Sequence, residues 1–444
     1  MTKLDWRACL GYPVGIFGPM LGWIAVIQYL LYFYTDVAGI PPAKAGLIFM
    51  LGMIWDAVSD PLVGFLADRT RTRWGRYRPY LLFGSVPFAV VVAFTFFPVG
   101  DKTADYFWLA LITHLLFRTG YTLVYMPFTA MIARITTSYD SRTLLAAIKT
   151  EFIFLANLTI SWGFYTLVDR FGGGEEGHSF FRAAMIVGAL AALTTLICFF
   201  SIREPEHEAG PPRPRGQLMQ AIPTLVKNRA FILLFFGVAI FGGFYGAEIS
   251  MTAYMAKYWL GDESYTKILF TAQAVASLAS IPFWYWLGVK KGKTHVWIAG
   301  VIMAATGLLG LFFLRPDNLY TMAGLYAFTN MGATGFITVF YAMTADSVDW
   351  GEWKTGQRHE GIIFGLVSFA NKFAAGVASF GVGAGLALIG FKADTQLDDG
   401  QLSGMFVIGM LLPALAFLAA AALMTQYPVS RQVHGKIVAD LVRK

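Results

Sequence analysis

The sequence predicts an all-α membrane protein with twelve transmembrane helices in two halves of six. The 444 residues are 57% hydrophobic and only 14% charged, which is too apolar for a water-soluble protein of this length. Apolar segments of about 20 residues, the length that crosses a bilayer as a helix, recur along the whole chain. A polar, proline-rich stretch separates six such segments from another six.

The twelve apolar segments account for most of the chain. Several exceed about 20 residues, so we expect them to tilt or to project from the bilayer. The first segment has no small-residue cleavage site, and no removable signal peptide is expected. The predicted helices are 11–35, 43–67, 77–98, 105–135, 145–169, 180–201, 229–259, 264–289, 294–314, 318–346, 358–390 and 402–426.

The placement of lysine and arginine predicts the orientation. Most of these residues lie in one alternating set of loops, together with both termini. Cytoplasmic loops of membrane proteins carry the excess of Lys and Arg. We therefore expect a multi-pass protein of the inner (cytoplasmic) membrane with both termini in the cytoplasm. The net charge of +7 reflects loops that face anionic lipid and does not require nucleic acid as a partner.

The two halves are expected to form separate bundles. A basic loop follows the second helix of the first half, and KKGK follows the second helix of the second half. Repeated six-helix halves are the plan of major facilitator transporters, which bind substrate between the halves. This pattern alone does not exclude another kind of twelve-helix transporter. The predicted division is an N-terminal bundle at 1–203, a cytoplasmic linker at 204–228, a C-terminal bundle at 229–430 and a cytoplasmic tail at 431–444.

The stretch from Gly52 to Pro79 carries the strongest functional signal. Asp56 and Asp60 lie in its apolar part, about one to two turns from the helix end, and an arginine cluster follows. A charge at the centre of a membrane helix costs roughly 2.5–3.5 kcal/mol. Acids one turn apart share a helix face, so both carboxylates can converge on one small cation. The alternative is that both acids reach water at the helix end.

Three stretches of the chain form a recognisable set. They are YLLYFYTDVAGI at 29–40, IWDAVSDPLVGFLADRTRTRWGRYRPYLL at 54–82 and ADSVDWGEWKTGQRHEGIIFG at 345–365. The second is the most specific, because it joins WDAxxDP to an arginine loop. Together they resemble the glycoside–pentoside–hexuronide:cation symporter family. The resemblance implies a major facilitator fold with two six-helix bundles, and sugar uptake driven by Na⁺, Li⁺ or H⁺.

The resemblance also implies where the coupling cation binds. Hard cations prefer carboxylate and hydroxyl oxygens as ligands. Close carboxylates without a cation tend to keep a proton, so Na⁺ and H⁺ would compete for one place. No cofactor is expected other than the transported cation, Na⁺ or H⁺. The expected cation-coupling residues are Asp56, Ser59 and Asp60 on the second helix and Thr122 on the fourth.

The resemblance predicts the sugar-binding residues less directly than the cation-binding residues. Melibiose-transporting members of the family have acids where this chain has Met20 and Tyr125, so two carboxylates that hold sugar hydroxyls are missing. A stripe of residues three and four apart on the fourth helix stands in their place, and Trp23 offers a ring for stacking on a sugar. The expected substrate-binding residues are Met20, Trp23, Arg118, Tyr121, Tyr125, Thr129, Lys149, Ser368, Asn371 and Lys372.

Several of these residues have a second interpretation. Trp23 and the tyrosines can serve packing alone, and Lys149 can extend to the cytoplasm. Arg118 either binds the carboxylate of an acidic sugar such as a glucuronide, or pairs with a protein acid, in which case the substrate is a neutral glycoside. Glu248 on the seventh helix either lines an outer vestibule or reaches water.

Charged residues in two cytoplasmic loops suggest a gate between the halves. Ion pairs across these loops would close the inner side and stabilise the outward-open state. The alternative is that the arginines only set topology and bind lipid. The expected gate residues are Arg69, Arg73, Arg76, Asp346, Asp349 and Glu352.

These patterns predict a transporter and not an enzyme. The sequence has no Walker loop, no GxGxxG in a βαβ unit and no HExxH. We expect a monomeric secondary active transporter for cation-coupled symport of a sugar, glycoside or uronide by alternating access, with membrane lipid as its other partner. One alternative is a symporter of lysolipids or other amphiphiles. Another is a non-transporting membrane sensor, which the buried acids disfavour because their cost requires a ligand.

Overall fold

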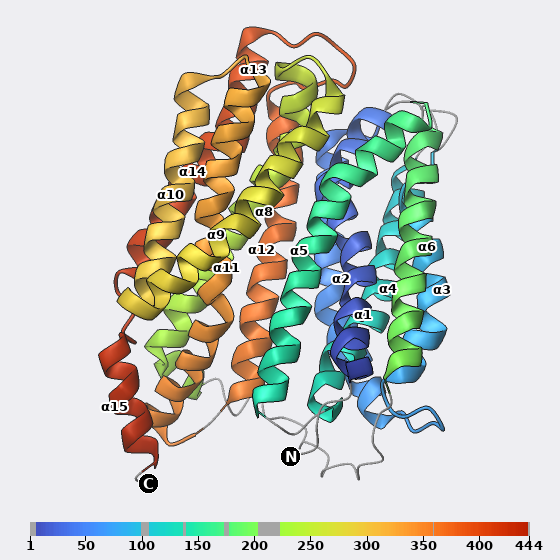
Figure 1. The fold of residues 1–444 in the computed structure, drawn as a ribbon. Coiled ribbons are helices and arrows are strands. Elements are labelled where there is room, and N and C mark those ends of the chain that lie inside the picture. The colour runs from blue at the N-terminus through green and yellow to red at the C-terminus, as the bar shows by residue number, and fades with distance from the viewer. Residues whose placement is uncertain are drawn as a thin grey trace. The chain divides into compact units, whose positions relative to one another are not determined.

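The computed structural model describes residues 6–98, 106–135, 139–172, 177–202, 223–357 and 359–442. These residues are almost entirely helical (Figure 1), and within them the only β pairing is an isolated bridge between Thr72 and Gly75. Most of the predicted linker, up to residue 222, lies outside the described residues.

The first half of the chain contains six long helices. The first of them, α1, continues through two π-helical turns before it ends. The elements are α1 (Trp6–Ala25), η1 (Val26–Leu30), η2 (Phe33–Val37), α2 (Pro42–Arg69), α3 (Arg78–Thr95), α4 (Tyr106–Ile135), α5 (Tyr139–Arg170) and α6 (Gly177–Ser201).

The second half repeats this plan and adds a terminal helix. Its elements are α8 (Arg229–Tyr254), η3 (Met255–Trp259), η4 (Glu263–Tyr265), α9 (Thr266–Lys291), α10 (Lys293–Leu314), α11 (Leu319–Thr355), α12 (Glu360–Leu388), α13 (Asp399–Phe406), η5 (Val407–Leu411), α14 (Leu412–Met424) and α15 (Arg431–Val442). The first helix of each half therefore ends in a π-helical turn, η2 or η3, which adds to the repeat seen in the basic loops.

Each predicted apolar segment contains a helix, and eleven segments of the described chain are long and apolar enough to cross a membrane. The helix α11 is not among the eleven, so the count of twelve membrane helices stays a prediction. Polar side chains such as Thr329, Asn330 and Thr334 lower the hydropathy of α11, and all three are buried inside the protein. The helix also runs nine residues beyond its predicted end at 346, until Gly356 closes it with a φ of 72°.

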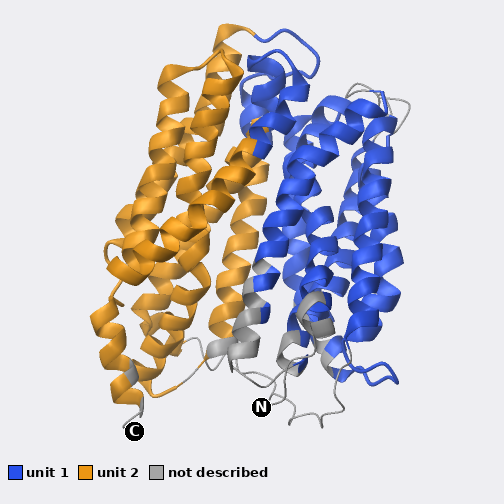
Figure 2. Cartoon of the chain, viewed as in Figure 1, with its two compact units in different colours: residues 1–209, 253–271, 383–397 blue, residues 210–252, 272–382, 398–444 orange. Residues whose placement is uncertain are grey.

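The chain forms two compact units (Figure 2). Unit 1 contains Met1–Ala209 together with Ala253–Thr271 and Gly383–Leu397. Unit 2 contains Gly210–Thr252, Ala272–Val382 and Asp398–Lys444. Two segments of the second half of the sequence, which include η3 and the residues after α12, thus pack with the helices of the first half.

Glycines allow close helix crossings inside each unit. In unit 1, a Cβ on Gly188 of α6 would lie 2.5 Å from the carbonyl oxygen of Ala89 on α3. In unit 2, a Cβ on Gly332 of α11 would lie 2.4 Å from the backbone nitrogen of Ala304 on α10. Small residues are the usual means by which membrane helices approach closely, because lipid gives no hydrophobic drive for helix association.

Candidate coupling and substrate site

Around Asp56, the helix α2 has a buried polar face and an exposed apolar face. Asp56 and Ser59 are buried, whereas their neighbours Trp55 and Val58 are exposed on the other face. A period of 3.6 residues puts positions 56, 59 and 60 on one side of the helix. In this part of α2, Asp56 and Ser59 therefore face the interior of unit 1, whereas Trp55 and Val58 lie on the exposed face.

Asp56 forms an ion pair with Arg118 of α4. The Nη1 atom of Arg118 lies 3.0 Å from Oδ2 of Asp56, and the side chains are 0% and 2% exposed. Arg118 Nε donates to Nε2 of His114 at 3.3 Å, and the guanidinium carbon lies 4.7 Å from the centre of the Trp23 ring. Of the two interpretations of Arg118, this geometry corresponds to pairing with a protein acid.

Asp60 accepts a hydrogen bond from a second residue of α4, Thr122. The hydroxyl of Thr122 donates to Oδ1 of Asp60 at 2.8 Å. Ser59 lies between the two acids on α2, and its buried hydroxyl has no hydrogen-bond partner among the described residues. The side chains of the expected cation site are thus brought together by α2 and α4. Its role as a cation site stays a prediction.

Aromatic rings stack beside this cluster. Trp23 stacks on Tyr121 with ring centres 4.7 Å apart, and Tyr121 stacks on Tyr125 at 4.9 Å. Tyr121 is buried, whereas Trp23 and Tyr125 are half-buried and keep part of their rings accessible. Met20, three residues before Trp23 on α1, is buried. The Thr129 hydroxyl donates a hydrogen bond to the backbone carbonyl oxygen of Met126 on the same helix. The stack thus leaves two rings partly accessible, and their contact with a sugar stays a prediction.

The remaining expected substrate residues lie apart from this cluster in sequence. Lys149 is half-buried on α5 in unit 1. Ser368 is exposed on α12 of unit 2, where Lys372 is half-buried. Asn371 packs against Gly242 of α8, because a Cβ on that glycine would lie 2.1 Å from Oδ1 of Asn371. A shared role of these residues with Arg118 stays a prediction.

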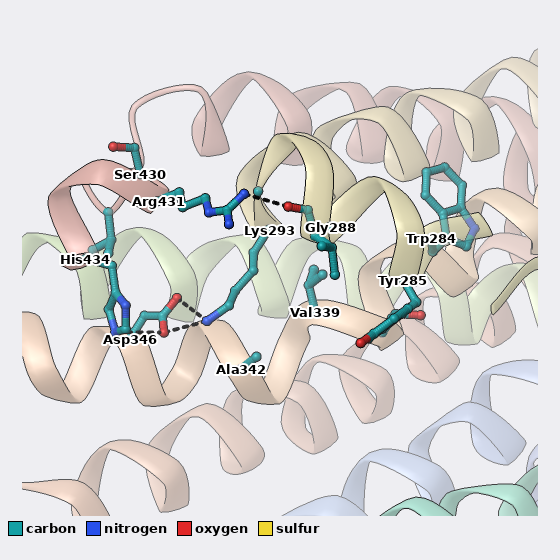
Figure 3. Close-up of a pocket in the computed structure, with 14 residues that line it drawn as sticks. Trp284, Tyr285, Gly288, Lys293, Val339, Ala342, Asp346, Ser430, Arg431 and His434 are labelled. Atoms are coloured by element: carbon teal, nitrogen blue, oxygen red, sulfur yellow. Dashed lines mark hydrogen bonds and ion pairs between the residues drawn. The ribbon is translucent and has the colours of Figure 1, made fainter. Parts of the chain in front are cut away.

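Two acids of the expected gate, Asp346 and Asp349, have partners inside unit 2. Both oxygens of Asp346 lie 2.7 Å from Nζ of Lys293, and Nε2 of His434 lies 3.5 Å from Asp346 and 3.4 Å from Asp349. Figure 3 shows Lys293, Asp346 and His434 pointing toward one another in a pocket of about 470 Å³. The partners Lys293 and His434 come from the start of α10 and from α15, and sequence spacing did not indicate them.

The arginines of the expected gate belong to the loop after α2 in unit 1. Arg73 lies over the ring of Trp74 at 4.3 Å, which holds it beside its neighbour. Arg69 and Arg76 flank the same loop, and Glu352 lies near the end of α11. Pairing of these arginines with the acids of α11 stays a prediction.

The sequence analysis missed a charged cluster in unit 1. Asp36, buried in η2, lies 3.2 Å from Nζ of Lys257 in η3, and the same nitrogen lies 2.7 Å from Asp394. The hydroxyl of Tyr258 also donates to Asp36. Burial raises the pKa of the Asp36 carboxyl, and the Lys257 ammonium acts in the opposite direction. The sequence feature that could have indicated this cluster is the pair of single charges at the ends of the first and seventh predicted helices, Asp36 and Lys257.

His114 was also missed as a member of the buried charge cluster. It is fully buried on α4, four residues before Arg118 and therefore on the same helix face. Its contact with Arg118 Nε helps to orient the guanidinium toward Asp56. A polar residue one turn from a membrane arginine was the signal for this contact.

The comparisons with known proteins support the fold and the class of protein. The isoprimeverose transporter of Lactiplantibacillus pentosus is 29% identical over 448 residues, covering 100% of this chain and 92% of that protein. The glucuronide carrier protein homolog of Escherichia coli (strain K12) is 27% identical, covering 99% of this chain and 96% of that protein. Both relatives span almost the full length of the chain, so the similarity is not confined to one motif.

A solved structure of a bacterial homolog of the human lysosomal transporter Spinster superposes with a TM-score of 0.69, covering 97% of this chain and 100% of that one at 13% identity. The nucleoside transporter NupG gives a TM-score of 0.66, covering 95% and 100% at 11% identity. These likenesses confirm the expected major facilitator fold.

The family described as MFS/sugar transport protein matches residues 11–431, nearly the whole chain. This match confirms the prediction of a transporter that is not an enzyme, and it disfavours the sensor alternative. The chain therefore belongs to the MFS/sugar transport protein family and is an integral membrane transporter.

Proposed function

We propose that the chain carries a glycoside into the cell across the inner membrane together with Na⁺ or H⁺. One observation carries this proposal. Two acids one turn apart on α2 are each held by a residue of α4, Asp56 by Arg118 and Asp60 by Thr122. The relatives named as an isoprimeverose transporter and a glucuronide carrier support a sugar or glycoside as the substrate.

The proposal includes the predicted topology. The bundles at 1–203 and 229–430 work as a monomer around the linker at 204–228, and both termini lie in the cytoplasm. The excess of basic residues in one set of loops supports this orientation. The arginines after α2 and the acids of α11 form the inner gate in another stage of the cycle.

Arg118 acts in this proposal as an internal cation. In the absence of the coupling cation it neutralises Asp56, whose carboxylate is buried at 2% exposure. A bound Na⁺ takes the oxygens of Asp56, Ser59, Asp60 and Thr122, and a proton takes one of the carboxylates. Either cation then competes with the guanidinium for Asp56, so binding releases Arg118 from that carboxylate.

The substrate is proposed to be a neutral glycoside. Arg118 already has a carboxylate partner at 3.0 Å, so a second carboxylate from the substrate would compete with Asp56 for the same guanidinium. The partly accessible rings of Trp23 and Tyr125 suit the apolar face of a sugar. An acidic sugar is the second candidate, because the cation would free Arg118 to bind it.

The coupling role is tested with Asp60→Asn in proteoliposomes. We expect gradient-driven accumulation to be lost while substrate exchange at equilibrium persists, because exchange needs no net cation movement. Asp169→Asn is the matched control, since it removes an acid of the same unit that pairs with Lys267 at the protein surface. Accumulation driven separately by Na⁺ and by H⁺ gradients identifies the ion. Full accumulation by Asp60→Asn would remove this acid from the coupling site.

The substrate charge is tested by uptake of a glucuronide and of the matching neutral hexoside. We expect the wild type to prefer the neutral sugar. A preference for the glucuronide that Arg118→Gln abolishes selectively would overturn the neutral-substrate proposal and support the acidic one. A lysolipid that inhibits uptake better than either sugar would point to the amphiphile alternative.

A further inference from the structure

Glu248 is a further buried acid, far in sequence from the acids of α2 and in unit 2. It lies 19 residues after Arg229 and 11 before Trp259, which places it about 28 Å and about 16 Å along the helix from the ends of this span. Its side chain is fully buried, and neither carboxylate oxygen has a hydrogen-bond partner among the described residues. One interpretation of the sequence was that Glu248 reaches water. The structure differs, because the side chain is fully buried.

An ionised carboxylate is expensive in this position. Moving such an ion into a low-dielectric interior costs several kcal/mol even after relaxation of the protein. Native proteins offset this cost with a counter-charge or with hydrogen bonds, and within the described part of the chain neither carboxylate oxygen of Glu248 has a hydrogen bond. A neutral carboxyl group, with a proton on one oxygen, avoids this cost.

Several polar side chains lie near Glu248. On its own helix and on α11, Tyr245 and Tyr326 lie within electrostatic range of the carboxyl. A chain of hydrogen bonds runs past the site, from Tyr245 to Asn330 at 2.8 Å, from Asn330 to Gln273 at 3.1 Å and from Gln273 to Thr252 at 3.4 Å. These hydroxyl and amide groups can each donate a hydrogen bond to a carboxylate after a change of rotamer.

The helix α12 and the segment from η5 to α14 also pack against this part of α8. Gly246 packs against Ala375 of α12, and Lys372 lies three residues earlier on that helix. Met251 packs against Gly409 of η5, and from there to the end of α14 the chain has no titratable side chain. Lys372 is thus the charged residue of α12 that lies nearest in sequence to this helix contact.

We propose that Glu248 is a proton-binding site of the C-terminal bundle, separate from the acids of α2. The carboxyl holds a proton in the arrangement described here and loses it when water reaches α8 at another stage of transport. In that step the O–H bond breaks, the proton passes to water, and the carboxylate remains with hydrogen bonds from the neighbouring tyrosine and amide groups. This inference rests on the proposed function for its place in a transport cycle, but the protonation itself does not.

The protonation is tested by infrared spectroscopy of the full-length protein in lipid nanodiscs. A protonated carboxyl has a carbonyl stretching band that an ionised carboxylate lacks. We expect Glu248→Gln to remove one such band at neutral pH. Asp399→Asn, which removes an exposed acid of the same unit, should leave that band in place. Glu248→Asp keeps a titratable group and should shift the band, which provides a second variant in case the glutamine variant folds poorly.

The role in transport is tested by the pH dependence of uptake. One coupled proton changes an equilibrium about tenfold per pH unit, so we expect accumulation to vary by up to about tenfold per unit of pH difference in the wild type. In Glu248→Gln this dependence should flatten, while the dependence on the acids of α2 remains. A carbonyl band that survives in Glu248→Gln, or an unchanged pH profile in that variant, would overturn the inference. Failure of transport in Asp60→Asn bears only on the proposed function, and the infrared band still tests Glu248.

Discussion

Replacement of Arg118 by glutamine tests the idea that the arginine competes with the coupling cation. At a separation of 3.0 Å and an effective dielectric constant of about 20, the attraction between Arg118 and Asp56 is about 5–6 kcal/mol. Desolvation of two buried ions cancels much of this attraction. Coupling energies between binding events are typically about 1–3 kcal/mol, which corresponds to about 5- to 150-fold in affinity. We therefore expect Na⁺ to bind Arg118→Gln more tightly than wild type by a factor in this range.

The assay is a Na⁺ titration followed by tryptophan fluorescence and by thermal stability at alkaline pH, where a proton competes least. Trp23 is a suitable reporter because the Arg118 guanidinium lies 4.7 Å from its ring. Arg170→Gln is the matched control, since it removes an exposed arginine at the end of α5. Unchanged or weaker Na⁺ affinity in Arg118→Gln would refute the competition.

A double-mutant cycle tests the same pair without any cation. Asp56→Asn leaves Arg118 buried without its counter-charge, which should lower the free energy of unfolding by about 3–5 kcal/mol. Adding Arg118→Gln to this variant should restore most of the loss, because a neutral pair replaces a lone charge. Additive effects of the two substitutions would show that the residues do not interact in the folded protein.

Two further predictions concern the units themselves. Lys257→Met leaves the buried carboxylate of Asp36 without the Lys257 ammonium and should lower the melting temperature, and adding Asp36→Asn should restore it. Lys267→Met is the control, because it removes a cation from a more exposed ion pair and should change the melting temperature little. A larger effect of Lys267→Met would contradict this account. Gly332→Ala should destabilise unit 2 by about 1–3 kcal/mol, since its Cβ would lie 2.4 Å from the backbone of α10. Gly324→Ala on the same helix meets nothing within 4 Å and should be neutral or stabilising, and equal melting curves for the two alanine variants would argue against the close crossing.

The sequence predicted the helix face on which Arg118 lies but not the residue with which it pairs. Spacings of three and four put Arg118, Thr122 and Tyr125 on one face of α4, and the stack of Tyr121 on Tyr125 agrees with that periodicity. Spacing within one helix does not say which residue of another helix lies opposite. Asp56 is 62 residues away in the chain, and only the packing of α2 on α4 brings it to Arg118.

The sequence by itself determined the helical membrane fold and its two halves, because apolar segment length and basic loop placement act locally along the chain. It also placed Asp56, Asp60 and Glu248 within apolar segments, but it left open whether their carboxyl groups reach water. The tertiary structure decided how each acid is satisfied: Asp56 by an arginine, Asp60 by a hydroxyl and Glu248 by no described neighbour. The reason is physical: the cost of burying a carboxyl depends on its own helix, whereas its counter-charge comes from whichever helix packs against it.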